Sequence, residues 1–414
     1  MRIAVWNDLR SGGGKRALYN HVKGLIERGH EVVSFCPDTA DLNFMPLSEL
    51  VEERVMPLKA NMEKGISWLK GLHPHVHQKT RAMLAHCKAC AEIINNEAFD
   101  VLFANSSTFS YMAHIGRFVK TPKLIYLGEP CRYFYEAQPE FLWKAPDAEN
   151  SNLVKYALKR IKHMVRVYWY SYMCREEYVS AKSYDLILVN SFFSRESVKR
   201  AYNLDSKVCY LGIDTDMFSY QDAKKGDYVI GMGYIQPSKG IEIAINSLAL
   251  VEPEYRPTLI WVSNNNKKDD YIDHIRNYAK SNNVNLIIKT LIPDVELFSL
   301  LSKARAFLYF PNLEPFGLAP LEANACGTAV ISIAEGGPRE TIKNGVNGFL
   351  VNDISYREIA DRIAAFFIDP HLSINMGRQS RNYILDTWNL KTGTDNIEFW
   401  LDFLAKKDQE HITI

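Results

Sequence analysis

Short apolar runs rich in β-branched residues alternate with amphipathic helical segments along almost the whole 414-residue chain. The runs show no alternation of polar and apolar residues, so both faces of each strand are expected to be buried. Strands of this kind form parallel sheets that helices cover on both sides. The pattern predicts an α/β fold with doubly wound parallel sheets, whose strands lie at residues 2–7, 31–36, 100–105, 123–128 and 185–190, then 228–233, 258–263, 284–289, 306–310 and 329–334.

The alternation of strands and helices restarts near residue 228, after the polar stretch "SYQDAKKGD". The chain is long enough to bury two cores. We predict a first domain over residues 1–211, a second over 212–385 and a helical tail over 386–414. The large apolar residues of the tail require a packing partner, and a return to the first domain is one option. Ligands of such sheets bind beyond the carboxyl ends of the strands, so we expect the active site in a cleft between two facing domains.

Composition narrows the class of protein and its location. The chain has 47% hydrophobic and 23% charged residues and a net charge of +1, which gives no overall attraction to nucleic acid. Seven scattered cysteines favour a reducing compartment over a disulfide framework. The N-terminus lacks the pattern of a signal peptide, and no apolar run approaches the roughly 20 residues that span a bilayer. We therefore expect a cytoplasmic protein without a nucleic-acid partner.

Two clusters of metal-ligating residue types are expected to bind no metal. Cys87 and Cys90 form a Cys-x-x-Cys within "AMLAHCKACAEII", which is helical by pattern and has no second pair, so we expect them in the core. The stretch "HPHVH" holds His73, His75 and His77, but no carboxylate or cysteine lies beside it. We predict that this stretch is a solvated loop.

A glycine-rich stretch, "SGGGKRAL", follows the first predicted strand. A triphosphate-binding loop would need glycine at Leu9 and serine or threonine at Arg16, and a dinucleotide fingerprint would need glycine at Ala17. The stretch is therefore either a turn that brings backbone N–H groups and a helix N-terminus to an anion, or a plain strand-to-helix turn.

The stretch "PNLEPFGLAPLEANACGTAVISIAEGGPRET", residues 311–341, carries the chemistry of the second domain. Glu314 lies in a loop after a strand, and Glu322 lies one turn into a helix that begins near Leu318. Gly317 allows the backbone to approach a ligand, and the helix start offers N–H groups to an anion. Carboxylates accept hydrogen bonds from hydroxyls, so this arrangement suits a ligand with both hydroxyls and phosphates.

This Glu-x7-Glu block resembles the signature of glycosyltransferase family 4, whose members are retaining GT-B enzymes that use a nucleotide-sugar donor. "GMGYIQPSKGIEIAI" is similar to the donor-phosphate loop of the family, "VCYLGIDTDMF" to the segment that joins its domains, and residues 11–35 to its opening. The resemblance implies two Rossmann-like domains that face each other across a cleft. It also implies metal-independent, retaining transfer of a hexosyl group to a glycan or lipid-linked acceptor, in cell-surface polysaccharide or glycolipid biosynthesis.

The resemblance also assigns roles to residues. Glu314 would hold hydroxyls of the donor sugar, and Glu322 would hold those of the ribose. Lys239 would neutralise the departing diphosphate, on which negative charge develops. The backbone of three residues would meet the sugar and diphosphate, namely Phe316, Gly317 and Leu318. The glycine turn, Gly12, Gly13 and Gly14, would lie near the diphosphate and the acceptor, and Lys15 and Arg16 either add charge there or are surface helix residues.

Two positions depart from the family pattern. Tyr234 stands where the family usually has an arginine that contacts the diphosphate, and its hydroxyl replaces only part of that contact. Lys15, Arg16 or Arg339 would have to supply the missing charge. Gly128 stands where many members have a histidine near the reacting carbon.

The residues after Gly128 fit a subset pattern, "EPxRxFYE", through Glu129, Pro130, Arg132 and Glu136. Glu129 and Arg132 either orient or bind the acceptor, or form a buried pair that shapes the loop. Without the histidine, the donor phosphate itself can accept the acceptor proton.

Residues 151–175 carry six lysines and arginines and no acid, with aromatic residues interleaved. A helix of this composition can lie on an anionic membrane, or its charges can form a solvated outer face. The first interpretation places the protein peripherally on the inner face of the cytoplasmic membrane.

Other functions remain open from the sequence. A nucleotide-sugar epimerase or hydrolase of the same fold is one alternative, and a sugar-nucleotide-binding protein without turnover is another, because of Gly128 and Tyr234. A nicotinamide oxidoreductase is disfavoured because its glycine fingerprint is absent.

Overall fold

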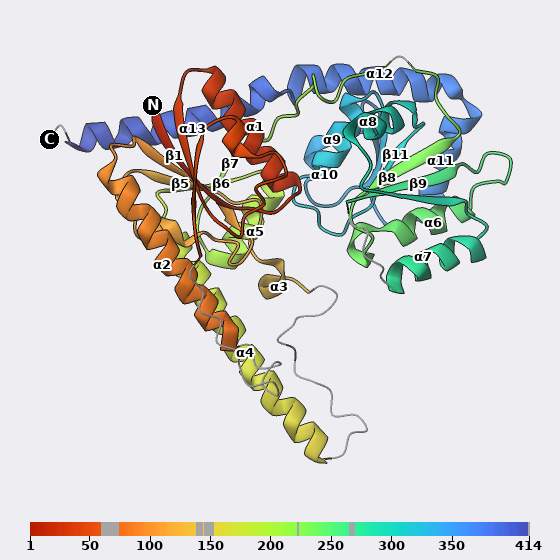
Figure 1. Ribbon diagram of the computed structural model, residues 1–414. Coiled ribbons are helices and arrows are strands. Elements are labelled where there is room, and N and C mark those ends of the chain that lie inside the picture. Colours follow the sequence, from red (N-terminus) through yellow and green to blue (C-terminus); the bar gives the residue numbers. More distant parts are fainter. Residues whose placement is uncertain (59–73, 138–143, 145–152, 222, 265–269, 413–414) are drawn as a thin grey trace. The chain divides into compact units, whose positions relative to one another are not determined.

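The computed structural model describes residues 1–58, 74–137, 144, 153–221, 223–264 and 270–412 (Figure 1). The chain divides into two compact units, the first formed by Met1–Tyr210 with Thr394–Ile414 and the second by Leu211–Gly393. Each unit contains one parallel sheet with helices on its faces. The predicted class of fold, two doubly wound α/β domains, is confirmed.

The sheet of the first unit has the strand order β3-β2-β1-β4-β5-β6-β7. The chain moves outward from β1 to β3 and then continues on the other side of β1, so the switch point lies between β1 and β4. The strands are β1 (Arg2–Asp8), β2 (Glu31–Pro37), β3 (Glu52–Met56), β4 (Val101–Ser107), β5 (Lys123–Tyr126), β6 (Leu186–Val189) and β7 (Lys207–Val208). The helices are α1 (Gly13–Glu27), α2 (Pro74–Asn96), α3 (Arg132–Tyr135), α4 (Leu153–Ala181) and α5 (Phe192–Tyr202), with short 3₁₀ turns η1 (Leu47–Glu49) and η3 (His114–Arg117).

The sheet of the second unit has the strand order β10-β9-β8-β11-β12-β13. Its switch point lies between β8 and β11, so the loops that leave these two strands begin side by side. The strands are β8 (Tyr228–Met232), β9 (Thr258–Ser263), β10 (Leu286–Thr290), β11 (Phe307–Tyr309), β12 (Val330–Ile333) and β13 (Gly348–Val351). The helices are η4 (Pro237–Lys239), α6 (Ile241–Ala249), α7 (Asp270–Ser281), α8 (Asp294–Lys303), α9 (Leu318–Ala325), α10 (Pro338–Thr341), α11 (Tyr356–Ile368) and α12 (Pro370–Thr387).

The C-terminal helix α13 (Leu390–Ile412) belongs to the first unit from Thr394 onward. Arg28, which follows α1, forms ion pairs with Asp395 and Glu398 of α13. Apolar side chains of α13 are buried at Ile397, Leu401 and Leu404. The tail therefore stabilises the first unit through both packing and charge.

The structure corrects one prediction about the histidine cluster. His75 and His77 lie in α2, which begins at Pro74, whereas we predicted a loop; His73 lies outside the described residues. Proline is favoured at the first helical position, and it starts the helix here. The His77 ring packs edge-on against Tyr172 of α4, with ring centroids 5.4 Å apart.

Cys87 and Cys90 are fully buried in α2, as predicted for core residues. Burial raises the pKa of both thiols, which keeps them protonated. Among the helices that the structure describes, we find none long and apolar enough to cross a membrane.

Candidate functional site

The loop between β11 and α9 carries the first of the two predicted glutamates. Gly317 ends this loop with φ of +90°, a conformation that favours glycine, and a Cβ there would approach the Tyr309 ring to 3.3 Å. No side chain caps α9, and its first turn holds no acidic residue. The start of α9 therefore presents backbone N–H groups and the positive end of the helix dipole to a ligand.

Glu314 and Lys239 form an ion pair within the second unit. Lys239 Nζ lies 3.0 Å from Glu314 Oε2, and the side chains keep 28% and 20% of their surface exposed, so a ligand can reach both. Lys239 ends η4, where Gly240 has φ of +72° and a Cβ would lie 2.2 Å from the Phe310 carbonyl oxygen. The loops that follow β8 and β11 are thus packed directly on each other.

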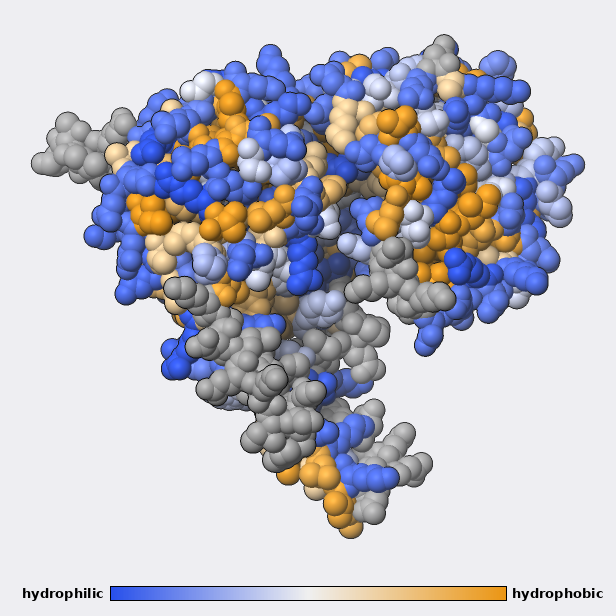
Figure 2. All heavy atoms as spheres, viewed as in Figure 1, coloured by the Kyte–Doolittle hydropathy of each residue, from blue (hydrophilic) through white to orange (hydrophobic). Residues whose placement is uncertain are grey.

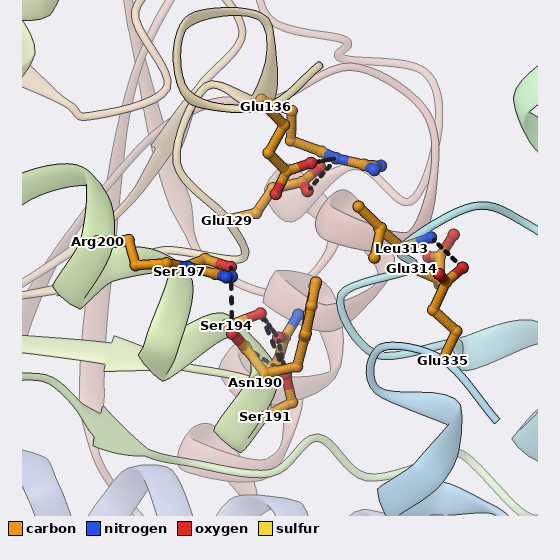
Figure 3. A network of polar contacts seen from close by, with 12 residues as sticks. Glu129, Glu136, Asn190, Ser191, Ser194, Ser197, Arg200, Leu313, Glu314 and Glu335 are labelled. Carbon is orange, nitrogen blue, oxygen red and sulfur yellow. Dashed lines mark hydrogen bonds and ion pairs between the residues drawn. The ribbon is translucent and has the colours of Figure 1, made fainter. Parts of the chain in front are cut away.

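One further loop, the loop after β12, fixes the backbone at Glu314 (Figure 3). The Leu313 amide donates to Glu335 Oε2 at 3.1 Å, and the Gly337 amide donates to the Glu314 carbonyl at 2.8 Å. A Cβ on Gly336, whose φ is +63°, would lie 2.2 Å from the same carbonyl oxygen. The loop after β12 therefore requires glycine at position 336, and it holds the backbone of Glu314 in place.

Tyr309, at the end of β11, links the two predicted glutamates. Burial raises the pKa of its hydroxyl, and the nearby carboxylates of Glu314 and Glu322 raise it further. Glu322 is itself 5% exposed on α9. Tyr309 therefore lies near both glutamates, and Glu314 is also paired with Lys239.

The other predicted residues of the second unit differ in burial and in their contacts. Phe316 is buried, with its ring centroid 5.7 Å from that of Trp388, and Leu318 is the first residue of α9. Tyr234 is 44% exposed after β8. Arg339 donates to the Gly336 carbonyl at 3.3 Å, so a cation lies beside the loop that supports Glu314.

The glycine turn of the first unit begins α1. Gly12 is the N-cap with φ of +140°, Gly13 and Gly14 are exposed, and no side chain caps this helix. Arg16 lies over the Phe44 ring at 5.9 Å. Lys15 is fully buried, so the alternative of a surface residue is wrong for it, and its Nζ has no hydrogen-bond partner among the described residues.

Glu129, Arg132 and Glu136 form a second charged group of the first unit (Figure 3). Arg132 Nε lies 2.7 Å from Glu136 Oε2 and 3.5 Å from Glu129 Oε2. The three side chains keep between 16% and 30% of their surface exposed. The group is therefore both an ion-paired loop and accessible, and neither sequence alternative is removed.

Polar residues that the sequence analysis did not select lie next to Gly128. A Cβ on Gly128 would lie 3.8 Å from Asn190 Nδ2, and Asn190 Oδ1 accepts a hydrogen bond from Ser194 at 2.8 Å. Ser191 caps α5 through the Ser194 amide (Figure 3). The signal in the sequence was the Asn-Ser pair, Asn190 and Ser191, at the end of the strand predicted over residues 185–190. Tyr309 and Glu335 were missed as well, although both lie within or next to the Glu-x7-Glu block.

Among the residues that the structure describes, no group of three or more histidine, cysteine, aspartate or glutamate side chains is placed to hold a metal ion. At the Glu314 site, the described groups that can act on a ligand include the carboxylate of Glu314, the ammonium group of Lys239 and the backbone N–H groups at the start of α9.

Comparisons with known proteins identify the family and the fold. An alpha-1,3/1,6-mannosyltransferase of Candida albicans is 24% identical over 294 residues, which cover 56% of this chain and 66% of the relative. A GDP-mannose-dependent alpha-(1-6)-phosphatidylinositol monomannoside mannosyltransferase of Mycolicibacterium smegmatis is 25% identical over 231 residues, covering 50% and 59%. The chain thus spans just under two thirds of the length of these curated relatives.

The crystal structure of HepE from Anabaena in complex with UDP and glucose has the same fold, with a TM-score of 0.69 at 18% identity, over 97% of this chain and 99% of that one. Two family models match, "glycosyltransferase family 4" over residues 11–217 and "glycosyl transferases group 1" over residues 212–383. Because the first match covers half of the chain and the second most of the other unit, this chain belongs to glycosyltransferase family 4, with the GT-B fold.

Proposed function

We propose that this protein is a retaining, metal-independent glycosyltransferase that moves a hexosyl group from a nucleotide sugar to a glycan or lipid-linked acceptor. The observation that carries the proposal is the accessible ion pair between Glu314, in the loop before α9, and Lys239 of η4. The names of the relatives support it, since both are mannosyltransferases and one acts on a phosphatidylinositol mannoside. The UDP and glucose of the HepE complex support a nucleotide-sugar donor.

The charges explain how the donor bond would break. Cleavage of the sugar–phosphate bond leaves negative charge on the diphosphate, and Lys239 with the amides at Phe316, Gly317 and Leu318 would stabilise that charge where it develops. Glu314 would hold the sugar hydroxyls, and Glu322 those of the ribose. The diphosphate oxygen would accept the proton of the acceptor on the face that the leaving group vacates, which retains the anomeric configuration.

The first unit would supply the acceptor side. Glu129 would orient the acceptor hydroxyl, and the guanidinium groups of Arg132 and Arg16 would bind acceptor oxygens or phosphate. Gly13 and Gly14 would approach the donor diphosphate through their backbone, and Tyr234 would contact it from the second unit. We place the protein in the cytoplasm, peripherally on the inner face of the membrane, in polysaccharide or glycolipid synthesis.

A donor panel tests the activity. The full chain is incubated with uridine, guanosine, adenosine and thymidine diphosphate sugars, with and without a lipid-linked glycan extract, and release of the nucleoside diphosphate is followed. Release that depends on the extract supports transfer. Release of free sugar without acceptor would indicate a hydrolase, and donor binding without release would indicate a non-catalytic protein.

Replacement of Glu322 is expected to weaken nucleotide binding. In Glu322→Ala, the ribose hydroxyls lose a charged acceptor worth about 1.5–3 kcal/mol, so the Kd of the nucleoside diphosphate should rise roughly 10- to 100-fold. Isothermal titration calorimetry on the folded variant measures this. Glu296→Ala, which removes a partly exposed carboxylate of the same unit, is the matched control. Equal Kd values for both variants would rule out the ribose role.

A further inference from the structure

Helix α4 has two halves with different surroundings. Its C-terminal half is part of the core of the first unit, with Met173 and Glu177 buried and Glu176 ion-paired to Arg117. Its N-terminal half extends from that unit (Figure 1), and Leu153 and Val154 are 83% and 65% exposed. Residues 151 and 152 of the predicted basic segment lie outside the described residues. The sequence alone did not reveal this division.

The exposed half carries one apolar stripe. Large apolar side chains recur every three or four residues, the spacing that places them on one face of a helix. They stay exposed by 50% or more, at Val154, Leu158, Ile161, Met164 and Tyr168. These five residues, called the apolar stripe below, extend about 21 Å along the helix at 1.5 Å per residue. An exposed apolar stripe of this length indicates an interaction surface.

Basic residues flank the apolar stripe on both sides. At 100° per residue, Lys162 and Lys155 lie next to one edge of the stripe, Arg166 and Lys159 lie further round the helix on that side, and Arg160 lies next to the other edge. Residues 153–175 contain no aspartate or glutamate. Figure 2 shows apolar and hydrophilic side chains together on the surface of this projecting segment.

This arrangement matches an anionic lipid bilayer better than it matches a protein copy. Apolar side chains at the centre of the face can enter the boundary between headgroups and acyl chains, while basic side chains on both edges reach the lipid phosphates. In a symmetric pair of α4 helices, the same basic side chains would face those of the second copy, and like charges repel. We propose that the apolar stripe of α4 lies flat in the headgroup region of an anionic membrane and attaches the protein there. This inference names the attaching face and does not rest on sugar transfer.

Vesicle flotation of the full chain tests the proposal. The native protein is compared on neutral phosphatidylcholine vesicles and on vesicles with 30% phosphatidylglycerol, at low and high salt. It should bind the anionic vesicles and dissociate from them at high salt. A triple variant, Lys155→Gln with Lys159→Gln and Lys162→Gln, should bind them about a hundredfold more weakly, because each lysine near an anionic surface contributes about a fivefold factor.

A second variant, Leu158→Gln with Ile161→Gln, tests insertion of the stripe and should bind at least tenfold more weakly with its charges unchanged. Each variant has a matched control. One control replaces Lys88, Lys120 and Lys207, which are exposed lysines of the same unit, and the other replaces the exposed apolar residues Ile368 and Leu385 of the second unit. Both controls should bind the vesicles as the native protein does. Native-like binding by both α4 variants overturns the proposal. Loss of self-association in the apolar variant, with vesicle binding intact, assigns the stripe to a second copy and also overturns it.

Discussion

Glu314→Gln is expected to lower kcat about 10²- to 10³-fold while the protein stays folded. The carboxylate is held at Lys239 Nζ, 3.0 Å away, and beside the buried Tyr309 hydroxyl, so its position is fixed before a donor arrives. Glutamine keeps the shape and can still accept one hydrogen bond, but it removes the charge. Loss of a partly exposed ion pair changes the free energy of unfolding by no more than about 1 kcal/mol. Steady-state release of the nucleoside diphosphate measures kcat.

The matched control for this prediction is Glu242→Gln on α6, which changes a partly exposed carboxylate 3.6 Å from His274. It makes the same chemical change in the same unit, on a carboxylate that pairs with His274, and kcat should not change. If Glu314→Gln also retains native kcat, Glu314 does not act on the donor sugar. A fall in kcat that a matching loss of thermal stability accompanies would instead indicate a structural role.

The approach of Glu314 to Lys239 follows from the sequence, although 75 residues separate them. Apolar runs identified β8 and β11 as buried parallel strands, and the family resemblance assigned both residues to the donor site. The structure shows that the two strands are neighbours, so the loops that follow them leave from one edge of the sheet. The contacts that fix Glu314 were not predictable in this way. They depend on the single carboxylate of Glu335 and on a Gly336 backbone that passes so close that a Cβ would lie 2.2 Å from the Glu314 carbonyl oxygen.

The sequence analysis missed several strands at the sheet edges and the burial of one lysine. β3 and β7 were not predicted, because these edge strands are short or half exposed and lack a continuous apolar run. β13, with the sequence GFLV, was missed although its residues are apolar. Lys15, in contrast, precedes Leu18 and Val22 by three and seven residues, and both are fully buried. This spacing places Lys15 on the face of α1 that packs on the sheet, so the sequence carried the signal, but the charge favoured a surface position.

Glu177 is a buried carboxyl of the first unit that takes no part in the proposed chemistry. It lies on α4 without exposed surface, and its Oε2 accepts a hydrogen bond from the Tyr202 hydroxyl of α5 at 3.1 Å. Tyr135 of α3, next to the Arg132 group, interacts with the same carboxyl. Burial raises the pKa of Glu177 to about 8, and the two tyrosines offset only part of that shift. Glu177 is therefore a protonated, neutral acid at neutral pH, and it connects α4 to α3 and α5 through the two tyrosines.

The contribution of Glu177 to stability should for this reason decrease as the pH rises from about 4.5 to about 8. The buried histidines His21, His86 and His114, whose pKa values burial lowers, contribute in the opposite direction below about 6.5, so the effect of Glu177 is read from the difference between the native protein and a variant. In that range the unfolded chain has released the Glu177 proton, because the ordinary pKa of a glutamate is 4.5, while the folded protein keeps it. The folded state binds more protons, so the free energy of unfolding falls by up to about 1.4 kcal/mol per pH unit from this group. Glu177→Gln cannot ionise and should remove this slope, so the variant should be more stable than the native protein at pH 8 and nearly equal at pH 4.5.

Urea unfolding at several pH values measures the difference, with Glu92→Gln, which changes an exposed carboxylate of α2, as the control that keeps the native slope. Parallel curves for the native protein and Glu177→Gln would show that Glu177 is ionised in the folded state.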